Sequence, residues 1–371
     1  MRRVAGRAIA LLFLALSGKE TIAQKPVATV SVGERNGSVV AVNPVTNKVY
    51  VVGGLGNRLT EIDGRSFEAV SFHLQDTGKQ VASAHVAIDP NTNKIFVINV
   101  VSQNIAIVDG VTHIVSFVDT APGPYAIAVN PVTHKVYVAD FAGNAVTEFD
   151  ERRATTKNMA VGMAPSAVAV NWATNKVYVA NARSDTVSVI DGNTDHIVHV
   201  RVGRYPTALA IDKFRNEVYV ANTGGDDLTV IDGYTNSTQS VVVGDYPFEV
   251  AVNPATNKVY AALQTGGNVI VVDRNKGSRS EVPGAELPME FAVDELRNRI
   301  YAADPTGNRI LVINGDTNEC RAITGSGYLW KVNVNSLTNQ VYALSLISGE
   351  LAVYDGEPAK LPAWTLDLAG K

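Results

Sequence analysis

Apolar and polar residues alternate along most of this chain in short stretches that turn residues separate. Residues 205–244 contain one complete unit of this kind. Residues 206–211 alternate small and large apolar side chains, and residues 217–222, 228–231 and 239–243 form three further stretches of strand character. Period-two alternation predicts strands, and the Asp, Asn and Gly residues between them predict turns. The unit therefore predicts four short antiparallel strands in one small sheet.

This unit recurs at an almost constant interval. The motif Asn-Lys-Val-Tyr, or a close variant, occurs eight times; the first step between its aromatic residues is 46 residues and the other six are 41. The aromatic residues are Tyr50, Phe96, Tyr137, Tyr178, Tyr219, Tyr260, Tyr301 and Tyr342. A repeat of about 40–45 residues is typical of blade architectures, and a closed ring of sheets leaves no apolar end face exposed. We therefore predict an all-β protein, a β-propeller of eight four-stranded blades around a central channel, with seven blades as the alternative.

The N-terminal strand is expected to close this ring. Residues Val27–Gly33 resemble the fourth strand of a unit but precede any first strand. We predict that they complete the last blade beside Leu351–Tyr354. Residues Trp364–Leu368 are a competing candidate for the same position, and both strands could contribute.

Two stretches of the fourth unit carry a resemblance to a known family. Val177–Asn181 reads Val-Tyr-Val-Ala-Asn, and Val187–Gly192 reads Val-Ser-Val-Ile-Asp-Gly. The chain resembles the YVTN-repeat β-propeller family, which includes the YncE-like exported bacterial proteins, over essentially all of residues 27–356. The resemblance implies the fold but no single function. The wider superfamily includes exported binding proteins, surface-layer proteins and propeller subunits of periplasmic oxidoreductases. The eight units depart from the commonest seven-bladed pattern.

The N-terminus has the features of a secretory signal peptide. Arg2 and Arg3 precede an apolar stretch from Ala8 to Leu16, and small residues follow near Ala23. The apolar stretch is much shorter than the roughly 20 residues of a membrane span. We therefore predict a signal peptide at residues 1–23, a single propeller domain at 24–371, and a periplasmic or extracellular location. A monomer is expected because ring closure removes most free sheet edges.

Charge and cysteine content narrow the function further. The chain has 32 basic and 36 acidic residues; without residues 1–23 it keeps 28 and 35, a formal charge of −7. An acidic chain has no general attraction for phosphate backbones, so nucleic-acid binding ranks third among the functions considered. Cys320 is the only cysteine, which excludes an intramolecular disulfide. We expect it to be a buried or half-buried strand residue.

The first strand of each unit carries the candidate channel-lining residues. Two positions before the turn, seven units have alanine and the eighth has Asn333. Small side chains fit near the central axis of the ring, where the inner strands crowd together. Because side chains alternate along a strand, the position two residues earlier should also face the channel. That position reads Val39, His85, Ala126, Ala167, Ala208, Glu249, Glu290 and Lys331. The candidate ligand-binding residues at the channel mouth are therefore Glu249, Glu290, Lys331 and His85, with their neighbours Phe248, Met289 and Trp330.

This group of residues has two interpretations. The simpler one is a solvated ion pair between Lys331 and either Glu249 or Glu290, and it is favoured. The other is a site for a cation, an amine or a sugar, or an acid–base pair, because adjacent carboxylates can have separated pKa values.

Sequence motifs for catalysis are missing from the chain. It contains no nucleophile elbow, phosphate-binding loop, dinucleotide fingerprint, haem-attachment motif or metal-binding histidine spacing. The leading hypothesis is thus an exported, non-catalytic propeller that binds a ligand or partner at one rim. The alternative is a channel-mouth lyase or hydrolase, with a divalent cation as an optional cofactor.

Two other features are interpreted as structural. The longer connection at Gln75–Ser83 is read as loop variation rather than a lid. The aspartates that repeat with the motif, from Asp63 to Asp355, are read as turn residues, including Asp191 in a stretch that begins like a calcium loop but lacks its later ligands.

Overall fold

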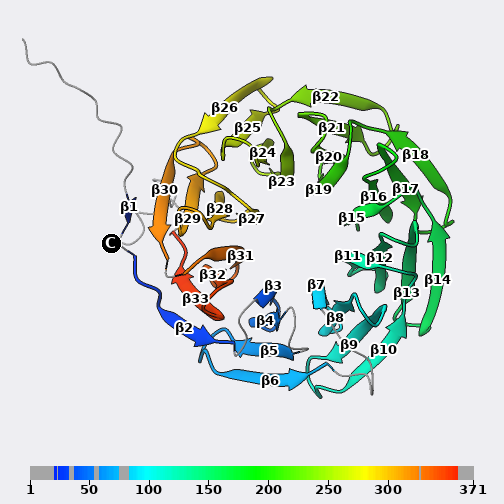
Figure 1. The fold of residues 1–371 in the computed structure, drawn as a ribbon, viewed down its shortest axis with the longest axis horizontal. Helices are drawn as coiled ribbons and strands as arrows, with labels where there is room; N and C mark the ends of the chain where they lie inside the picture. The colour runs from blue at the N-terminus through cyan, green and yellow to red at the C-terminus, as the bar shows by residue number, and fades with distance from the viewer. Residues whose placement is uncertain are drawn as a thin grey trace, which may run out of the picture.

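Eight small sheets stand side by side in a closed ring around a central channel (Figure 1). The computed structural model describes residues 21–22, 24–32, 37–53, 58–74, 83–325 and 327–357. Each blade has four antiparallel strands, and the prediction of eight blades is confirmed over the alternative of seven. The described residues contain no helix, and so none that could cross a membrane.

The first four blades follow the chain from the channel outward. Blade 1 consists of β3 (Gly37–Asn43), β4 (Lys48–Gly53), β5 (Arg58–Asp63) and β6 (Ala69–His73). Blade 2 consists of β7 (Ser83–Asp89), β8 (Lys94–Asn99), β9 (Asn104–Asp109) and β10 (Val115–Asp119). Blade 3 consists of β11 (Pro124–Asn130), β12 (Lys135–Asp140), β13 (Ala145–Asp150) and β14 (Thr155–Ala160). Blade 4 consists of β15 (Pro165–Asn171), β16 (Lys176–Asn181), β17 (Thr186–Asp191) and β18 (Ile197–Arg201).

The last four blades continue this order. Blade 5 consists of β19 (Pro206–Asp212), β20 (Glu217–Asn222), β21 (Asp227–Asp232) and β22 (Thr238–Val242). Blade 6 consists of β23 (Pro247–Asn253), β24 (Lys258–Leu263), β25 (Val269–Asp273) and β26 (Ser278–Val282). Blade 7 consists of β27 (Glu290–Asp294), β28 (Arg299–Asp304), β29 (Arg309–Asn314) and β30 (Cys320–Thr324). Blade 8 consists of β31 (Leu329–Asn335), β32 (Gln340–Ser345), β33 (Glu350–Asp355) and the N-terminal β2 (Ala28–Ser31).

The clasp between the two ends of the chain forms as predicted. Strand β2 pairs with β33 in antiparallel fashion, from Ala28 opposite Val353 to Ser31 opposite Glu350. The competing candidate at residues 364–368 lies outside the described residues, as do residues 75–82 of the longer connection. A further short strand, β1 (Thr21–Ile22), runs parallel to β30 on the outer edge of blade 7, where that edge strand offers free backbone groups.

The repeated motif has a separate physical role at each of its positions. Its first residue, Asn in seven blades and His in one, has a left-handed backbone with φ from 53° to 60°. Asparagine tolerates that conformation better than most residues with a side chain. The second residue begins the second strand, and in several blades it contacts the next blade, as where Lys258 Nζ donates to the carbonyl of Gly315 at 2.8 Å. The valine or isoleucine and the aromatic residue that follow are completely buried.

The hydrophobic core is divided among the blade interfaces. The buried apolar residues form eight clusters, and each contains side chains of two neighbouring blades. The cluster between blades 8 and 1 includes Val30 from the clasp strand together with Tyr342 and Ile62. Burying one such side chain contributes roughly 1.5–3 kcal/mol, and no blade can bury its faces alone. The ring therefore depends on every interface.

The repeated aspartates are turn residues, as predicted. The Oδ1 atom of Asp191 accepts hydrogen bonds from the backbone N–H groups of Asn193 and Thr194 at 2.9 and 3.1 Å. Such bonds stabilise the ionised carboxyl and hold the pKa of Asp191 below its usual value. Cys320 is half-buried on β30, as expected, and burial raises the pKa of its thiol to about 11.

Candidate functional site

The innermost strand of each blade lines the channel (Figure 1). In seven of these strands the ladder register shifts just before the predicted channel position, for example between Pro247 and Glu249. A β-bulge of this kind bends the strand and re-aims the side chains around it. The alternation along a regular strand did not predict this irregularity. It places a bend at the start of the strand that carries Glu249.

The ionisable arc, defined here as His85, Glu249, Glu290 and Lys331, comes from four inner strands. The structure joins two of its members directly, because Lys331 Nζ lies 3.4 Å from Glu290 Oε1. The backbone N–H of Val332 donates to the other oxygen of Glu290 at 3.4 Å. The ion pair that the sequence left open is therefore Glu290 with Lys331.

The pair is partly exposed but strongly affected by its surroundings. The side chains of Lys331 and Glu290 are 21% and 26% exposed, so both still contact channel water. Loss of bulk solvent raises the pKa of Glu290, while the charge of Lys331 and its hydrogen bonds act in the opposite direction.

Glu249 is the carboxyl of the arc that lies outside this ion pair. Among the described residues its carboxyl group forms no ion pair, and its side chain is only partly exposed. Desolvation is the main cause that raises the pKa of Glu249 to about 8; the charge of Glu290 also raises it, while the charge of Lys331 acts in the opposite direction. At neutral pH the carboxyl therefore holds a proton for most of the time.

His85 is the remaining member of the arc. Its ring lies 5.8 Å from the ring of Tyr125 in the next blade. Burial, together with the positive charge of Lys331, lowers the pKa of His85 to about 4. The imidazole is consequently neutral at pH 7.

The predicted apolar companions lie on the same strands or next to them. Phe248 and Trp330 belong to β23 and β31, and Met289 immediately precedes β27. All three are half-buried. Trp330 stacks on Tyr328 with ring centroids 6.3 Å apart. No hydrogen bond or ring contact among the described residues links these three to the arc.

The other side of the channel is apolar at the level of the arc. The corresponding positions carry the small side chains of Ala126, Ala167 and Ala208, of which Ala208 is buried in the core between blades 5 and 6. Two residues further along each inner strand, seven blades have alanine and blade 8 has Asn333. The side chain of Asn333 donates to the carbonyl of Val40 at 3.2 Å. The channel is therefore charged on one arc and apolar on the other.

Two exposed tyrosines at the same rim were not predicted as site residues. Tyr205 and Tyr246 have left-handed backbones, with φ of 53° and 55°, and their side chains are 45% and 52% exposed. The equivalent residue in blade 3 is Gly123. A bulky residue in this conformation is unusual and is often found at functional sites. The sequence signal for these two residues was a tyrosine at a position where an equivalent repeat has glycine.

The described residues include one group suited to a metal ion, at the other end of the inner strands. It consists of Asp89, His134 and Glu151, which come from two blades. Sequence spacing did not reveal it, because its members belong to different repeats. The signal was that all three differ from the commonest residue at their repeat positions.

Comparison with solved structures places the ring among β-propellers. Sqt1 of Saccharomyces cerevisiae aligns with a TM-score of 0.75 and 11% identity, over 91% of this chain and 100% of that chain. Hydrazine synthase of Kuenenia stuttgartiensis aligns with a TM-score of 0.59 and 17% identity, over 73% of this chain and 94% of that chain. A catalytically inactive virginiamycin B lyase of Staphylococcus aureus aligns with a TM-score of 0.60 and 11% identity, over 74% and 94%.

These likenesses show the fold alone, because unrelated functions share the propeller architecture. No family model matches the chain, and a search of curated proteins finds no match either. The resemblance to YVTN-repeat proteins therefore stays a prediction.

Proposed function

We propose that this protein is an exported, non-catalytic propeller that binds a small cationic ligand at the mouth of its central channel. The observation that carries the proposal is the charge of the ionisable arc. Glu290 is paired with Lys331, whereas Glu249 has no cationic partner among the described residues. His85 is neutral at pH 7 and supplies no charge. The arc is thus one positive charge short when both carboxyls are ionised.

A proton fills this deficit when no ligand is bound. The raised pKa of Glu249, about 8, means that ionisation there is costly at neutral pH. A cation beside the carboxyl would remove that cost, because an opposite charge within a few ångströms favours the ionised form. Binding at pH 7 should therefore release a proton from Glu249.

The rest of the channel favours an organic cation over a hydrated inorganic one. The inner strands opposite the arc carry alanine at the corresponding position, and the half-buried Ala126 and Ala167 offer apolar contact and no oxygen ligands. Sites for small molecules typically combine an apolar lining with a few polar groups. Exposed tyrosines at the same rim could add cation–π contacts to an ammonium group.

A matched pair of probes tests the proposal. Benzylamine and benzyl alcohol have nearly the same shape, but only the amine is charged at pH 7. We expect benzylamine to raise the melting temperature of the full chain and benzyl alcohol to leave it unchanged. Titration calorimetry in two buffers of different ionisation enthalpy should show release of up to one proton per amine bound.

Two carboxyl variants provide the control. Glu249→Gln should abolish the response to the amine, whereas Glu281→Gln, at an exposed carboxyl on β26 of the same blade, should keep it. An amine response that survives in Glu249→Gln would refute this assignment of the site. Equal responses to amine and alcohol would refute the cationic class of ligand.

The two carboxyls also support a second candidate, a lyase or hydrolase at the channel mouth. One carboxyl has a pKa of about 8 and its neighbour is stabilised by a lysine, and such separation can supply an acid and a base. Turnover of a bound substrate that Glu249→Gln eliminates while affinity persists would favour the enzyme. Binding without turnover would favour the binding protein.

A further inference from the structure

We propose that blades 2 and 3 bind a divalent transition-metal ion between Asp89, His134 and Glu151. Asp89 is the last residue of β7, His134 lies in the turn between β11 and β12, and Glu151 follows β13. One oxygen of each carboxylate and one ring nitrogen of His134 all lie within 4.8 Å of one another. This site is independent of the ionisable arc, which lies at the opposite end of the inner strands.

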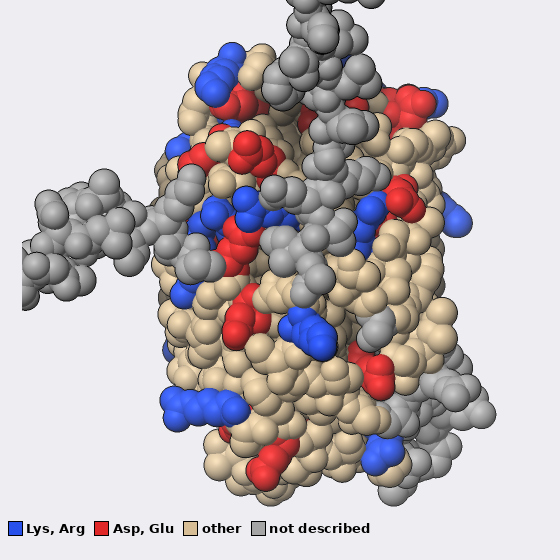
Figure 2. Space-filling model, turned by 90° about the vertical axis from the view of Figure 1, so that its left-hand side faces the viewer, with Lys and Arg blue, Asp and Glu red and all other residues tan. Residues whose placement is uncertain are grey.

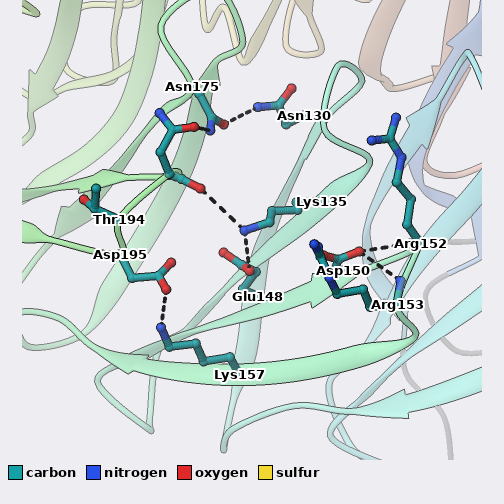
Figure 3. Close-up of polar contacts among 12 residues, drawn as sticks. Asn130, Lys135, Glu148, Asp150, Arg152, Arg153, Lys157, Asn175, Thr194 and Asp195 are labelled. Atoms are coloured by element: carbon teal, nitrogen blue, oxygen red, sulfur yellow. Dashed lines mark hydrogen bonds and ion pairs between the residues drawn. The ribbon is translucent and has the colours of Figure 1, made fainter.

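Five other blade interfaces show what this position normally contains. There an asparagine at the end of the inner strand donates its side-chain N–H to the motif asparagine of the next blade. The pairs are Asn43–Asn93, Asn130–Asn175, Asn171–Asn216, Asn253–Asn298 and Asn335–Asn47, at 2.6 to 2.8 Å. Figure 3 shows the pair Asn130–Asn175 between blades 3 and 4. A neutral amide pair is therefore sufficient to fasten two blades.

The remaining aspartates at this position have a different partner from Asp89. Asp212 and Asp294 each pair with an arginine three residues later in their own blade, at 2.8 and 3.2 Å. The equivalent residue after Asp89 is Thr92, which carries no charge. Asp89 is completely buried and instead contacts His134 Nδ1 at 2.7 Å.

Glu151 also departs from the repeat. Six of the eight blades have glycine at its position, and blade 6 has Arg274. Glu151 pairs with Lys94 at 3.0 Å, as Arg274 pairs with Glu217 at 3.2 Å, so each ion pair fastens two blades. That pairing accounts for Glu151 by itself. It does not account for the convergence of Glu151 with an Asp–His pair that no other described interface has.

The donor set indicates the class of metal. Imidazole nitrogen with carboxylate oxygens suits zinc and related divalent transition metals, whereas calcium and magnesium prefer oxygen ligands alone. Ligands about 2.0–2.2 Å from zinc lie roughly 3–4 Å apart, so the three side chains need only small adjustments. A cation bridging His134 and Asp89 replaces the proton that they share. Three protein ligands would leave one coordination position for water or a ligand.

The second oxygens of the carboxylates are already held by protein groups. Asp89 Oδ1 accepts from the backbone N–H of Asn91 at 2.9 Å, and Glu151 Oε2 accepts from Thr92 Oγ1 at 3.3 Å. Such outer contacts orient metal ligands in known sites. The ammonium group of Lys94 would compete with a metal ion for Glu151. Replacing Lys94 therefore tests whether a metal binds there.

The chain itself supplies the best control variant. Asp89→Asn, His134→Asn and Glu151→Gly together recreate the interface found between blades 4 and 5, so this triple variant should fold normally. We expect Zn²⁺ to raise the melting temperature of the full chain by a few degrees, EDTA to reverse the rise, and the triple variant to show no response. Mg²⁺ should have no comparable effect on either protein.

Two further variants separate a built site from adventitious zinc. His196→Asn, at an exposed histidine on blade 4, should keep the response. Lys94→Met should strengthen zinc binding if the cation competes with the ammonium group. A missing or non-saturable zinc response, or one retained by the triple variant, would overturn the proposal. So would weaker zinc binding in Lys94→Met.

Discussion

At the residue scale, the repeated tyrosines differ in what their hydroxyl groups contact. Tyr219 donates to Glu217 Oε2 at 2.5 Å, and Tyr342 donates to Gln340 at 2.8 Å. The buried hydroxyl of Tyr178 has no hydrogen-bond partner among the described residues. In blade 2 the position is Phe96, which has no hydroxyl. Packing of the ring, rather than hydrogen bonding, is therefore the role that these residues share.

This difference predicts unequal effects of the same substitution. Tyr178→Phe should change the free energy of unfolding by less than about 0.5 kcal/mol, because no bond among the described residues is lost. Tyr219→Phe should cost about 1.5–3 kcal/mol, because it removes a bond to a charged group. Denaturant unfolding of both variants measures the difference. Equal costs would mean that Tyr178 has a partner, such as a buried water molecule.

Glu249 predicts a pH dependence of stability. Its pKa is about 8 in the folded chain, and the ordinary value in an unfolded chain is about 4.3. Between these values the folded state binds more protons, so the contribution of Glu249 to stability is complete below about pH 4.3 and is lost as pH rises through about 8. Glu249→Gln should therefore flatten the fall in melting temperature between pH 5 and pH 8.

The expected size is small. At pH 8 the variant should melt about 1–2 °C above the native chain, as about 1 kcal/mol would produce in a protein of this size. Thermal scans of both proteins across the pH range test this, with Glu281→Gln as the control. A variant whose melting profile stays parallel to that of the native chain would contradict the raised pKa.

At the element scale, the clasp strand β2 holds the ring closed. It forms the outer edge of blade 8, and its Val30 is 7% exposed within the core between blades 8 and 1. The neighbouring Thr29 is exposed on the same strand. A short strand with one buried side chain thus connects the two ends of the chain.

Truncation of Val30 should weaken this connection. Val30→Ala removes two buried carbon atoms and should cost about 2 kcal/mol, counting lost burial and the cavity left behind. Thr29→Ala should change stability by less than about 0.5 kcal/mol, as surface substitutions usually do. Denaturant unfolding and limited proteolysis near the N-terminus measure both effects. Equal stability of the two variants would show that the clasp does not bear on closure.

At the scale of the whole molecule, the apolar packing repeats from one blade interface to the next, whereas the charged side chains differ from blade to blade. Each interface has its own hydrophobic cluster, but the polar contacts between blades range from amide pairs to ion pairs such as Lys157–Asp195 (Figure 3). On the outer face beside blades 7 and 8, basic and acidic side chains are interspersed (Figure 2). The described residues visible on that face form no broad region of one sign.

This charge distribution predicts weak or no binding of nucleic acid. The acidic balance of the chain should repel phosphate backbones, and attraction would need a concentrated basic patch. Electrophoretic mobility-shift assays with duplex DNA and single-stranded RNA at low salt should show no complex. Binding that weakens steeply with added salt would contradict this and favour the third function considered.

The sequence by itself determined the ring. The 41-residue interval, the alternation within each unit and the strand at residues 27–33 were enough to predict eight blades and the clasp. These features follow from local periodicity and from the need to bury both faces of every sheet. Comparing equivalent positions of the repeat also grouped four residues into one arc: Glu249, Glu290, Lys331 and His85.

Only the tertiary structure decided which side chains meet. It selected Glu290 rather than Glu249 as the partner of Lys331, and it placed bulges that regular alternation does not contain. It also brought Asp89, His134 and Glu151 together from two blades. Repeat phase places a residue on a strand, but contacts across an interface depend on side-chain rotamers and on how neighbouring blades pack. Those distances are properties of the closed ring and not of any single unit.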